Sequence, residues 1–204
     1  NNAKKMMEIE GLASVHLDYV RYPDVILGAD LQPKYNLVQE TEMPEYDYDY
    51  HPIAREGFKK IFDKDPMDFK YRLNAVTSLV NDIIELAHAK NKKVTAAVFP
   101  FPEMSRQMVR QAWNDWNLDT AYPMLYQNFY RENINWIGFA TKQGVSDVDF
   151  PIISGLYAPA LRDPKDLKKA ILIAKENGAK GISIFTADGL TKEQQAVFVK
   201  LKNK

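Results

Sequence analysis

The sequence contains no cysteine among its 204 residues. This absence excludes disulfide bonds, thiol catalysis and thiolate metal sites. An excess of either charge is also missing, because 27 lysine and arginine residues balance 27 aspartate and glutamate residues. A chain with zero net charge lacks the basic surface by which proteins bind nucleic acid or anionic membranes, so we expect neither partner.

Long apolar runs and glycine-rich loops are missing as well. No apolar run approaches the ~20 residues that span a bilayer, and the N-terminal segment lacks the apolar region of a signal peptide. No glycine-rich segment follows an expected strand, so we predict neither a phosphate-binding loop nor a dinucleotide site. The 3 histidines have no metal-ligand spacing, and we expect no metal and no cofactor. Composition leaves the compartment open, and our expectation is a periplasmic or extracellular protein.

Aromatic residues are abundant, with 11 tyrosines, 10 phenylalanines and 3 tryptophans. Several of them follow apolar segments that have the character of strands. A flat amphipathic ring at the mouth of a cleft can stack on a sugar, although aromatic side chains also fill cores. The composition therefore permits a carbohydrate site without requiring one.

Apolar segments typical of strands alternate with amphipathic helical segments along the chain. The expected strands are 12–17, 94–99, 118–124, 151–156 and 181–185. The expected helices are 3–10, 53–62, 65–90, 103–113, 132–143, 163–178 and a last helix capped by Thr191 with Gln194 as its capping-box partner. Continuously apolar strands that alternate with helices predict a parallel sheet covered on both faces.

Residues 19–52 interrupt this alternation with a long segment rich in Tyr, Asp, Glu and Pro. The segment has no clean helical period, and the Tyr/Asp alternation at its centre could imitate a strand. Loops of this length in compact domains are usually functional or disordered. We predict a long functional loop or lid.

Two architectures fit the alternation, an open doubly wound sheet and a (β/α)8 barrel. Polar and varied segments after the strands favour the barrel, whose active site lies at that face. A barrel needs eight strands and about 250 residues, so we expect an α/β TIM-type barrel of which residues 1–204 carry only the last five units, strands 4 to 8. An incomplete barrel exposes two sheet edges. We therefore expect the rest of a longer protein, or another chain, to supply the missing strands.

The most informative segment is 14–24, in which a short apolar strand ends in polar and aromatic residues. Asp18 lies where the strand gives way to the loop, a setting that can tune a pKa or hold a nucleophile. By strand alternation, His16 and Asp18 share a face and can both line a cleft. The alternative interpretation is a structural ion pair between Asp18 and Arg21.

The run His16-Leu-Asp-Tyr-Val-Arg-Tyr-Pro23 resembles the fourth-strand motif of the family 10-like glycosyl hydrolases, a barrel group found mainly in bacteria. Segments 51–58, 97–102 and 118–126 are similar to later motifs of that family, in the same order. The resemblance extends from Gly11 to Gly189. It implies a glycosidase-like catalytic domain.

The resemblance also implies roles for two carboxylates. In related retaining glycosidases an Asp on the fourth strand is commonly the nucleophile, and this position falls on Asp18. The candidate acid/base nearest by position is Glu103, although Glu103 could equally be an acidic residue favoured in the first turn of a helix. Arg21 would hold Asp18 ionised. The other strand-end carboxylates are Asp24, Asp119 and Asp188, and structural roles are favoured for the last two.

The sequence thus predicts a glycoside hydrolase that cleaves O-glycosidic bonds of a poly- or oligosaccharide with two carboxylates. The expected substrate-binding residues are His16, Tyr19, Arg21, Tyr126, Gln127 and Tyr157. The alternative is a non-catalytic carbohydrate-binding or scaffold module on a barrel fold. A hydrolase of amides or esters is less favoured, because no Ser-His-Asp or metal constellation is recognisable. A lone carboxylate without a second carboxyl within ~10 Å would favour binding over hydrolysis.

Overall fold

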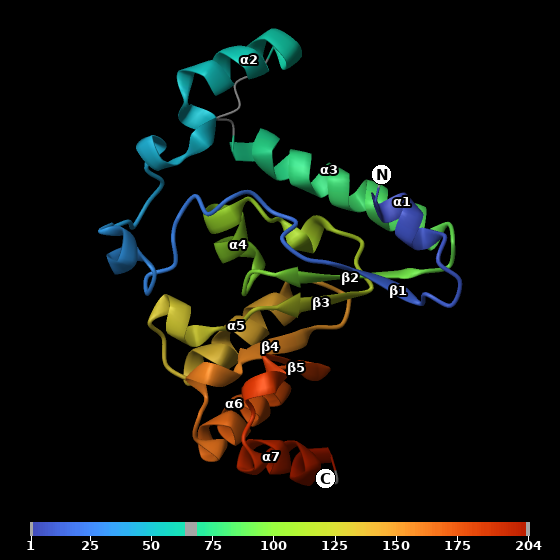
Figure 1. Ribbon diagram of the computed structural model, residues 1–204, viewed down its shortest axis with the longest axis vertical. Helices are drawn as coiled ribbons and strands as arrows, with labels where there is room; N and C mark the ends of the chain where they lie inside the picture. Colours follow the sequence, from blue (N-terminus) through green and yellow to red (C-terminus); the bar gives the residue numbers. More distant parts are fainter. Residues whose placement is uncertain (1, 64–68, 203–204) are drawn as a thin grey trace.

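The computed structural model describes residues 2–63 and 69–202, an α/β fold in which parallel strands alternate with helices (Figure 1). The strands are β1 (Ser14–Leu17), β2 (Lys93–Val98), β3 (Thr120–Pro123), β4 (Ile153–Tyr157) and β5 (Gly181–Phe185). Each of the five lies within or next to an expected strand, and the alternating α/β organisation is confirmed.

The strands are parallel and follow one another in chain order. β1, β2 and β3 form one sheet, and β4 pairs with β5 in a second. Two parallel bridges, Ala121 to Ile152 and Met124 to Gly155, join β3 to β4, so the two sheets are neighbours. All five carboxyl ends therefore point toward the same side of the molecule.

Seven α-helices occur in the described part of the chain, and most match the expected positions. They are α1 (Asn2–Met7), α2 (Pro52–Phe62), α3 (Phe69–His88), α4 (Pro102–Val109), α5 (Asn135–Ser146), α6 (Pro164–Glu176) and α7 (Lys192–Lys202). The expected start of the third helix, at residues 65 and 66, lies outside the described residues. α4 is shorter than expected, because Arg110 takes a left-handed conformation with φ of 55° and ends the helix.

Two helix caps are present, and the second of them was predicted. The Asp163 side chain accepts a hydrogen bond from the Lys165 N–H at 2.8 Å at the start of α6. Before α7, Thr191 and Gln194 exchange side-chain-to-backbone hydrogen bonds of 2.9 and 3.2 Å, as a capping box requires. None of the helices in residues 2–63 and 69–202 is long and apolar enough to cross a membrane.

The two faces of the strands differ in what covers them. Val94, Ala96 and Val98 of β2 are fully buried and belong to the same core as Val80 and Ile84 of α3. Alternate residues, which lie on the other face of the strands, line a cavity instead: they are Ala97, Tyr122, Gly155 and Ser183. The expectation of a sheet covered on both faces is corrected for these positions, because the second face of the strands borders a pocket.

The long segment 19–52 is irregular, with three short 3-10 turns: η1 (Gln32–Tyr35), η2 (Pro44–Tyr46) and η3 (Tyr48–Tyr50). Hydrogen bonds fasten it at several points. The N–H groups of Tyr22 and Val25 donate to the carbonyls of Val109 and Met108, and Asp30 N–H donates to the carbonyl of Phe129. The loop is therefore anchored to the end of α4 and to the segment after β3, as a fixed wall.

Two glutamines fix the shape of this loop from within. The Gln39 side chain is buried, donates to the carbonyl of Val25 at 2.7 Å and accepts the N–H of Leu27 at 2.8 Å. The Gln32 side chain donates to the carbonyls of Leu27 and Gln39 and accepts the Gln39 N–H. These side chains supply partners for backbone groups that no helix or sheet satisfies.

A buried charge cluster ties the far end of the loop to α3 and α4. Arg72 is 1% exposed, and its Nη1 lies 2.7 Å from Asp47 and 3.7 Å from Asp49. Glu42 pairs with both arginines, Arg72 and the fully buried Arg110. Burial and the neighbouring Asp47 charge raise the pKa of Asp49 above its ordinary value. Because the cluster joins distant parts of the chain, it holds the loop 19–52 in place.

Gly155 allows β3 and β4 to approach each other. A Cβ atom at this position would lie 2.9 Å from the Pro123 carbonyl oxygen, and that atom belongs to the backbone. We expect Gly155→Ala to lower the free energy of unfolding by about 1–3 kcal/mol, measured by chemical denaturation. Gly57→Ala in α2 is the matched control, because nothing lies within 4 Å of its added Cβ. It should stabilise the helix by about 0.5–1 kcal/mol, and equal effects of the two substitutions would contradict the close-approach account.

Candidate functional site

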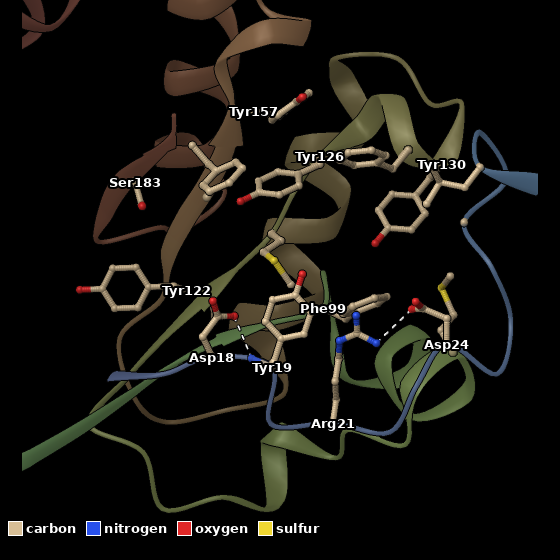
Figure 2. Close-up of a pocket in the computed structure, with 18 of the residues that line it drawn as sticks. Asp18, Tyr19, Arg21, Asp24, Phe99, Tyr122, Tyr126, Tyr130, Tyr157 and Ser183 are labelled. Atoms are coloured by element: carbon tan, nitrogen blue, oxygen red, sulfur yellow. Dashed lines mark hydrogen bonds and ion pairs between the residues drawn. The ribbon is translucent and has the colours of Figure 1, made fainter. Parts of the chain in front are cut away.

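A pocket of about 550 Å³ lies at the carboxyl ends of the strands (Figure 2). Each strand contributes a residue at or just beyond its end: Asp18, Phe99, Met124, Tyr157 and Phe185. Other lining residues come from within the strands, from the loop after β1, from α4 and from η5 (Gln127–Tyr130), the 3-10 turn after β3. In a parallel α/β fold this edge is where ligands bind.

Asp18 lies in the pocket just beyond the last residue of β1. Its Oδ1 accepts the N–H of Tyr19 at 2.8 Å, and Tyr19 turns the chain with φ of 55°. No ion pair to Asp18 is found among the described residues. The carboxylate therefore keeps acceptor capacity for a ligand.

Arg21 does not pair with Asp18. Its Nη1 lies 3.1 Å from Oδ1 of Asp24 and donates to the Tyr22 carbonyl at 3.0 Å. The left-handed turn at Tyr19 separates Asp18 from the residues that follow it. The alternative interpretation of a structural ion pair between Asp18 and Arg21 is therefore wrong, and the expected influence of Arg21 on Asp18 involves no direct contact.

His16 lies beside Asp18 on the pocket face of β1. Its Nδ1 hydrogen-bonds the Thr95 hydroxyl at 2.7 Å, and its ring meets Tyr122 edge to face at 5.3 Å. Burial lowers the pKa of His16, and the nearby Asp18 charge opposes this only in part. The imidazole is therefore mainly neutral at pH 7, with one ring nitrogen able to donate and the other to accept.

Four aromatic rings form a wall of the pocket, and we call them the aromatic wall: Tyr126, Phe129, Tyr157 and Phe185. The Tyr126 ring lies 5.4 Å from Tyr157 and 6.0 Å from Phe185, and it is stacked on the latter. Phe129 closes the group at 5.4 Å from Tyr157. Flat rings with hydroxyl groups suit the faces and edges of a sugar.

The Tyr126 hydroxyl belongs to the same electrostatic environment as Asp18. Burial and the Asp18 charge raise the pKa of Tyr126 to about 12. The hydroxyl therefore stays protonated at neutral pH and can donate a hydrogen bond. Figure 2 shows it turned toward the open part of the pocket.

The structure brings together six of the eight residues predicted for the site: His16, Asp18, Tyr19, Arg21, Tyr126 and Tyr157. Glu103 and Gln127 are not among the pocket-lining residues. Glu103 is exposed in the first turn of α4, the position of its structural alternative. Gln127 is 4% exposed and lies buried at the start of η5.

The sequence did not predict a site role for several lining residues: Asp24, Phe99, Phe129, Tyr130 and Phe185. Phe185 and Phe99 could have been found by the rule that singled out Asp18, because both lie at or just beyond the end of a strand. Tyr130 and Phe129 depend on the course of η5, which no local pattern specifies. The predicted residues thus lie together at the centre of the pocket, whereas much of the pocket wall was not predicted.

Asp119 lies away from the pocket, just before β3 begins. It pairs with His88 at 2.9 Å and accepts the Val94 N–H at 2.7 Å. Although burial alone would raise the pKa of Asp119, these hydrogen bonds lower it. In the described part of the chain, no group of His, Asp and Glu side chains could hold a metal ion.

No family model matches the chain, and no curated protein matches it. Among solved structures, it matches one described as a putative fructose-1,6-biphosphate aldolase from Coccidioides immitis, with a TM-score of 0.34 and 12% sequence identity. The match covers 75% of this chain, which spans 63% of the length of that structure. A likeness at this level assigns no activity.

Proposed function

We propose that the protein is a glycoside hydrolase whose pocket binds a sugar against the aromatic wall and presents the scissile bond to Asp18. One observation carries this proposal: a carboxylate without an ion-pair partner among the described residues lines the same pocket as a group of stacked tyrosine and phenylalanine rings. Rings supply flat contact area, and the tyrosine hydroxyls supply hydrogen bonds for orientation. The carboxylate supplies a nucleophile or a charge that stabilises an oxocarbenium-like transition state.

The fold that we propose for this function is a partial (β/α)8 barrel made of its last five units. Its support is the strictly sequential order of parallel strands, with one face packed in the core and the other lining a pocket. At the outer edges, β1 pairs only with β2 and β5 only with β4 among the described residues. We propose that the rest of a longer protein, or another chain, pairs with these two edges.

Hydrolysis requires a second carboxyl group. Among the described residues that line the pocket, Asp24 is the only carboxylate besides Asp18, and Arg21 holds it in an ion pair. Glu103 lies outside the pocket lining. The proposal therefore places the general acid on the strands that complete the barrel.

The same observation supports a second candidate, a carbohydrate-binding module without catalysis. If no carboxyl group joins Asp18 from elsewhere, the pocket keeps its stacking surface and loses the pair that hydrolysis needs. Cleavage separates the two candidates, because both predict sugar binding and only the first predicts products.

The test is a screen of the full-length protein against neutral and acidic poly- and oligosaccharides, with reducing-end release and titration calorimetry as readouts. We expect cleavage by the wild type and an affinity roughly 5- to 30-fold weaker for Tyr126→Ala, because the central ring of the wall is lost. Tyr46→Ala is the control, since Tyr46 is exposed and lies outside the pocket. Binding without cleavage would select the second candidate, and no binding to any sugar would contradict both.

A further inference from the structure

A second set of polar side chains lines the pocket apart from Asp18, and we call it the Arg21 group: Arg21, Asp24 and Tyr130. Figure 2 shows the three together, with Tyr19 and Phe99 between them and Asp18. The aromatic wall and Asp18 do not explain why an ion pair and a tyrosine hydroxyl converge there.

The Arg21 guanidinium is held in one orientation. Its Cζ lies 5.1 Å from the centre of the Phe99 ring and 5.2 Å from that of Tyr19. Its Nη1 is engaged by the Tyr22 carbonyl and by Asp24. Because the side chain is stacked and hydrogen-bonded before any ligand arrives, little conformational entropy is lost when its other N–H groups bind one.

Tyr130 completes the group from η5. Its hydroxyl is turned toward Arg21 and Asp24 in Figure 2, and it has no hydrogen bond to another described residue. Burial, and next the Asp24 charge, raise the pKa of Tyr130. The hydroxyl therefore remains a protonated donor and acceptor at neutral pH.

We propose that Arg21, Asp24 and Tyr130 form a second sugar subsite that selects a neutral, hydroxyl-bearing unit, so that the substrate is an oligosaccharide of at least two units. This inference rests on the proposed function. Arg21 donates, Asp24 accepts and Tyr130 does both, which matches the mixed character of sugar hydroxyls. A uronic acid would meet the Asp24 carboxylate and an amino sugar the Arg21 guanidinium, so the pair disfavours charge of either sign.

The size of the pocket agrees with two units. Its volume of about 550 Å³ lies within the ~300–1,000 Å³ of pockets that hold drug-sized ligands. A disaccharide resembles such ligands in size more closely than a monosaccharide does. Asp18 and the aromatic wall would hold one unit, and the Arg21 group would hold its neighbour.

Titration calorimetry on the full-length protein tests the subsite. The probes are methyl glycosides of glucose, xylose, mannose and galactose, their neutral disaccharides, and disaccharides in which one unit is a uronic acid. In the wild type we expect a neutral disaccharide to bind more tightly than the methyl glycoside and roughly 10-fold more tightly than the uronic-acid disaccharide. Asp24→Asn and Tyr130→Phe should each lower, by roughly 10-fold, the ratio of the affinity for a neutral disaccharide to the affinity for its methyl glycoside. Asp24→Asn should also bring the affinities for neutral and uronic-acid disaccharides closer together.

Asp30→Asn is the matched control, because Asp30 belongs to the same loop and lies outside the pocket lining. It should change neither the affinity nor the discrimination. Tyr130→Phe removes only a hydroxyl, so it remains informative if Asp24→Asn fails to fold. The subsite proposal would fail, and the proposed function would stand, in either of two cases. One is sugar binding in which both variants keep the wild-type ratio of disaccharide to methyl-glycoside affinity; the other is tighter wild-type binding of the uronic-acid disaccharide than of the neutral one. No binding or cleavage of any probe by the wild type would overturn both.

Discussion

Replacement of Asp18 by asparagine is expected to lower kcat/KM for glycoside cleavage by about 10³-fold or more. The carboxylate lies at the end of β1, in contact with the pocket and without an ion-pair partner among the described residues. Asparagine keeps the shape and can still accept the Tyr19 N–H, so the fold and the sugar affinity should be retained. Cleavage needs the negative charge, either as a nucleophile or as a stabiliser of positive charge at the anomeric carbon.

The measurement is steady-state cleavage kinetics on the full-length protein, with sugar affinity determined on the same preparations. Asp30→Asn is again the matched control, because it makes the same change outside the pocket lining. We expect its kinetics to equal those of the wild type. Cleavage by Asp18→Asn within a few fold of the wild-type rate would show that Asp18 is not the catalytic carboxylate.

The second large effect is expected on stability, at Arg72. Arg72→Met should lower the free energy of unfolding by about 3–5 kcal/mol, because it leaves the nearly buried Asp47 carboxylate without its cation. The side chain of Asp47 is 9% exposed and lies 2.7 Å from Arg72, so Asp47 loses the most electrostatic stabilisation. For a protein of this size, such a loss corresponds to a fall in Tm of roughly 6–20 °C.

Chemical denaturation and thermal melting measure this effect, with Lys60→Met as the control. Lys60 pairs with Glu56 on the exposed surface of α2, so its replacement should have an effect within about 0.5 kcal/mol. Asp47→Asn added to Arg72→Met should recover part of the loss, since it removes the stranded charge. A change below about 1 kcal/mol for Arg72→Met would contradict the role of the cluster as the clamp of loop 19–52.

The elements that sequence predicted well are those whose signals are local. β5 was expected at 181–185 and occupies Gly181–Phe185, because its apolar run is bounded by glycine and a turn. The capping box of Thr191 and Gln194 formed as predicted, since both partners lie within one helical turn. Asp18 at a strand end was also identifiable, because the apolar run before it stops abruptly.

Predictions failed where contacts between distant residues decide the outcome. α4 ends at Val109 because Arg110 leaves the helix and pairs with Glu42, which is far away in the sequence. A local conformation accounts for another miss: Arg21 pairs with Asp24, only three residues away, and a left-handed turn at Tyr19, uncommon for a residue other than glycine, lies between Asp18 and Arg21. No periodicity in the chain encodes either contact.

The wall of the pocket shows the same limit. Strand ends predict which residues reach one edge of the sheet, and they account for Asp18 and Tyr157. They do not predict that η5 returns Phe129 and Tyr130 to that edge, or that the buried Gln39 fixes the loop beside it. The centre of a site built on parallel strands can therefore be predicted, whereas the parts contributed by loops need the three-dimensional structure.

A crystal structure of full-length Asp18→Asn with an oligosaccharide that the wild type cleaves would show whether this pocket binds a sugar with its scissile bond at Asp18. We expect a sugar ring against Tyr126 and Tyr157, with the glycosidic linkage beside the carboxamide that replaces the Asp18 carboxylate. An oligosaccharide bound elsewhere on the protein, or one in the pocket with its linkage remote from that carboxamide, would contradict this expectation.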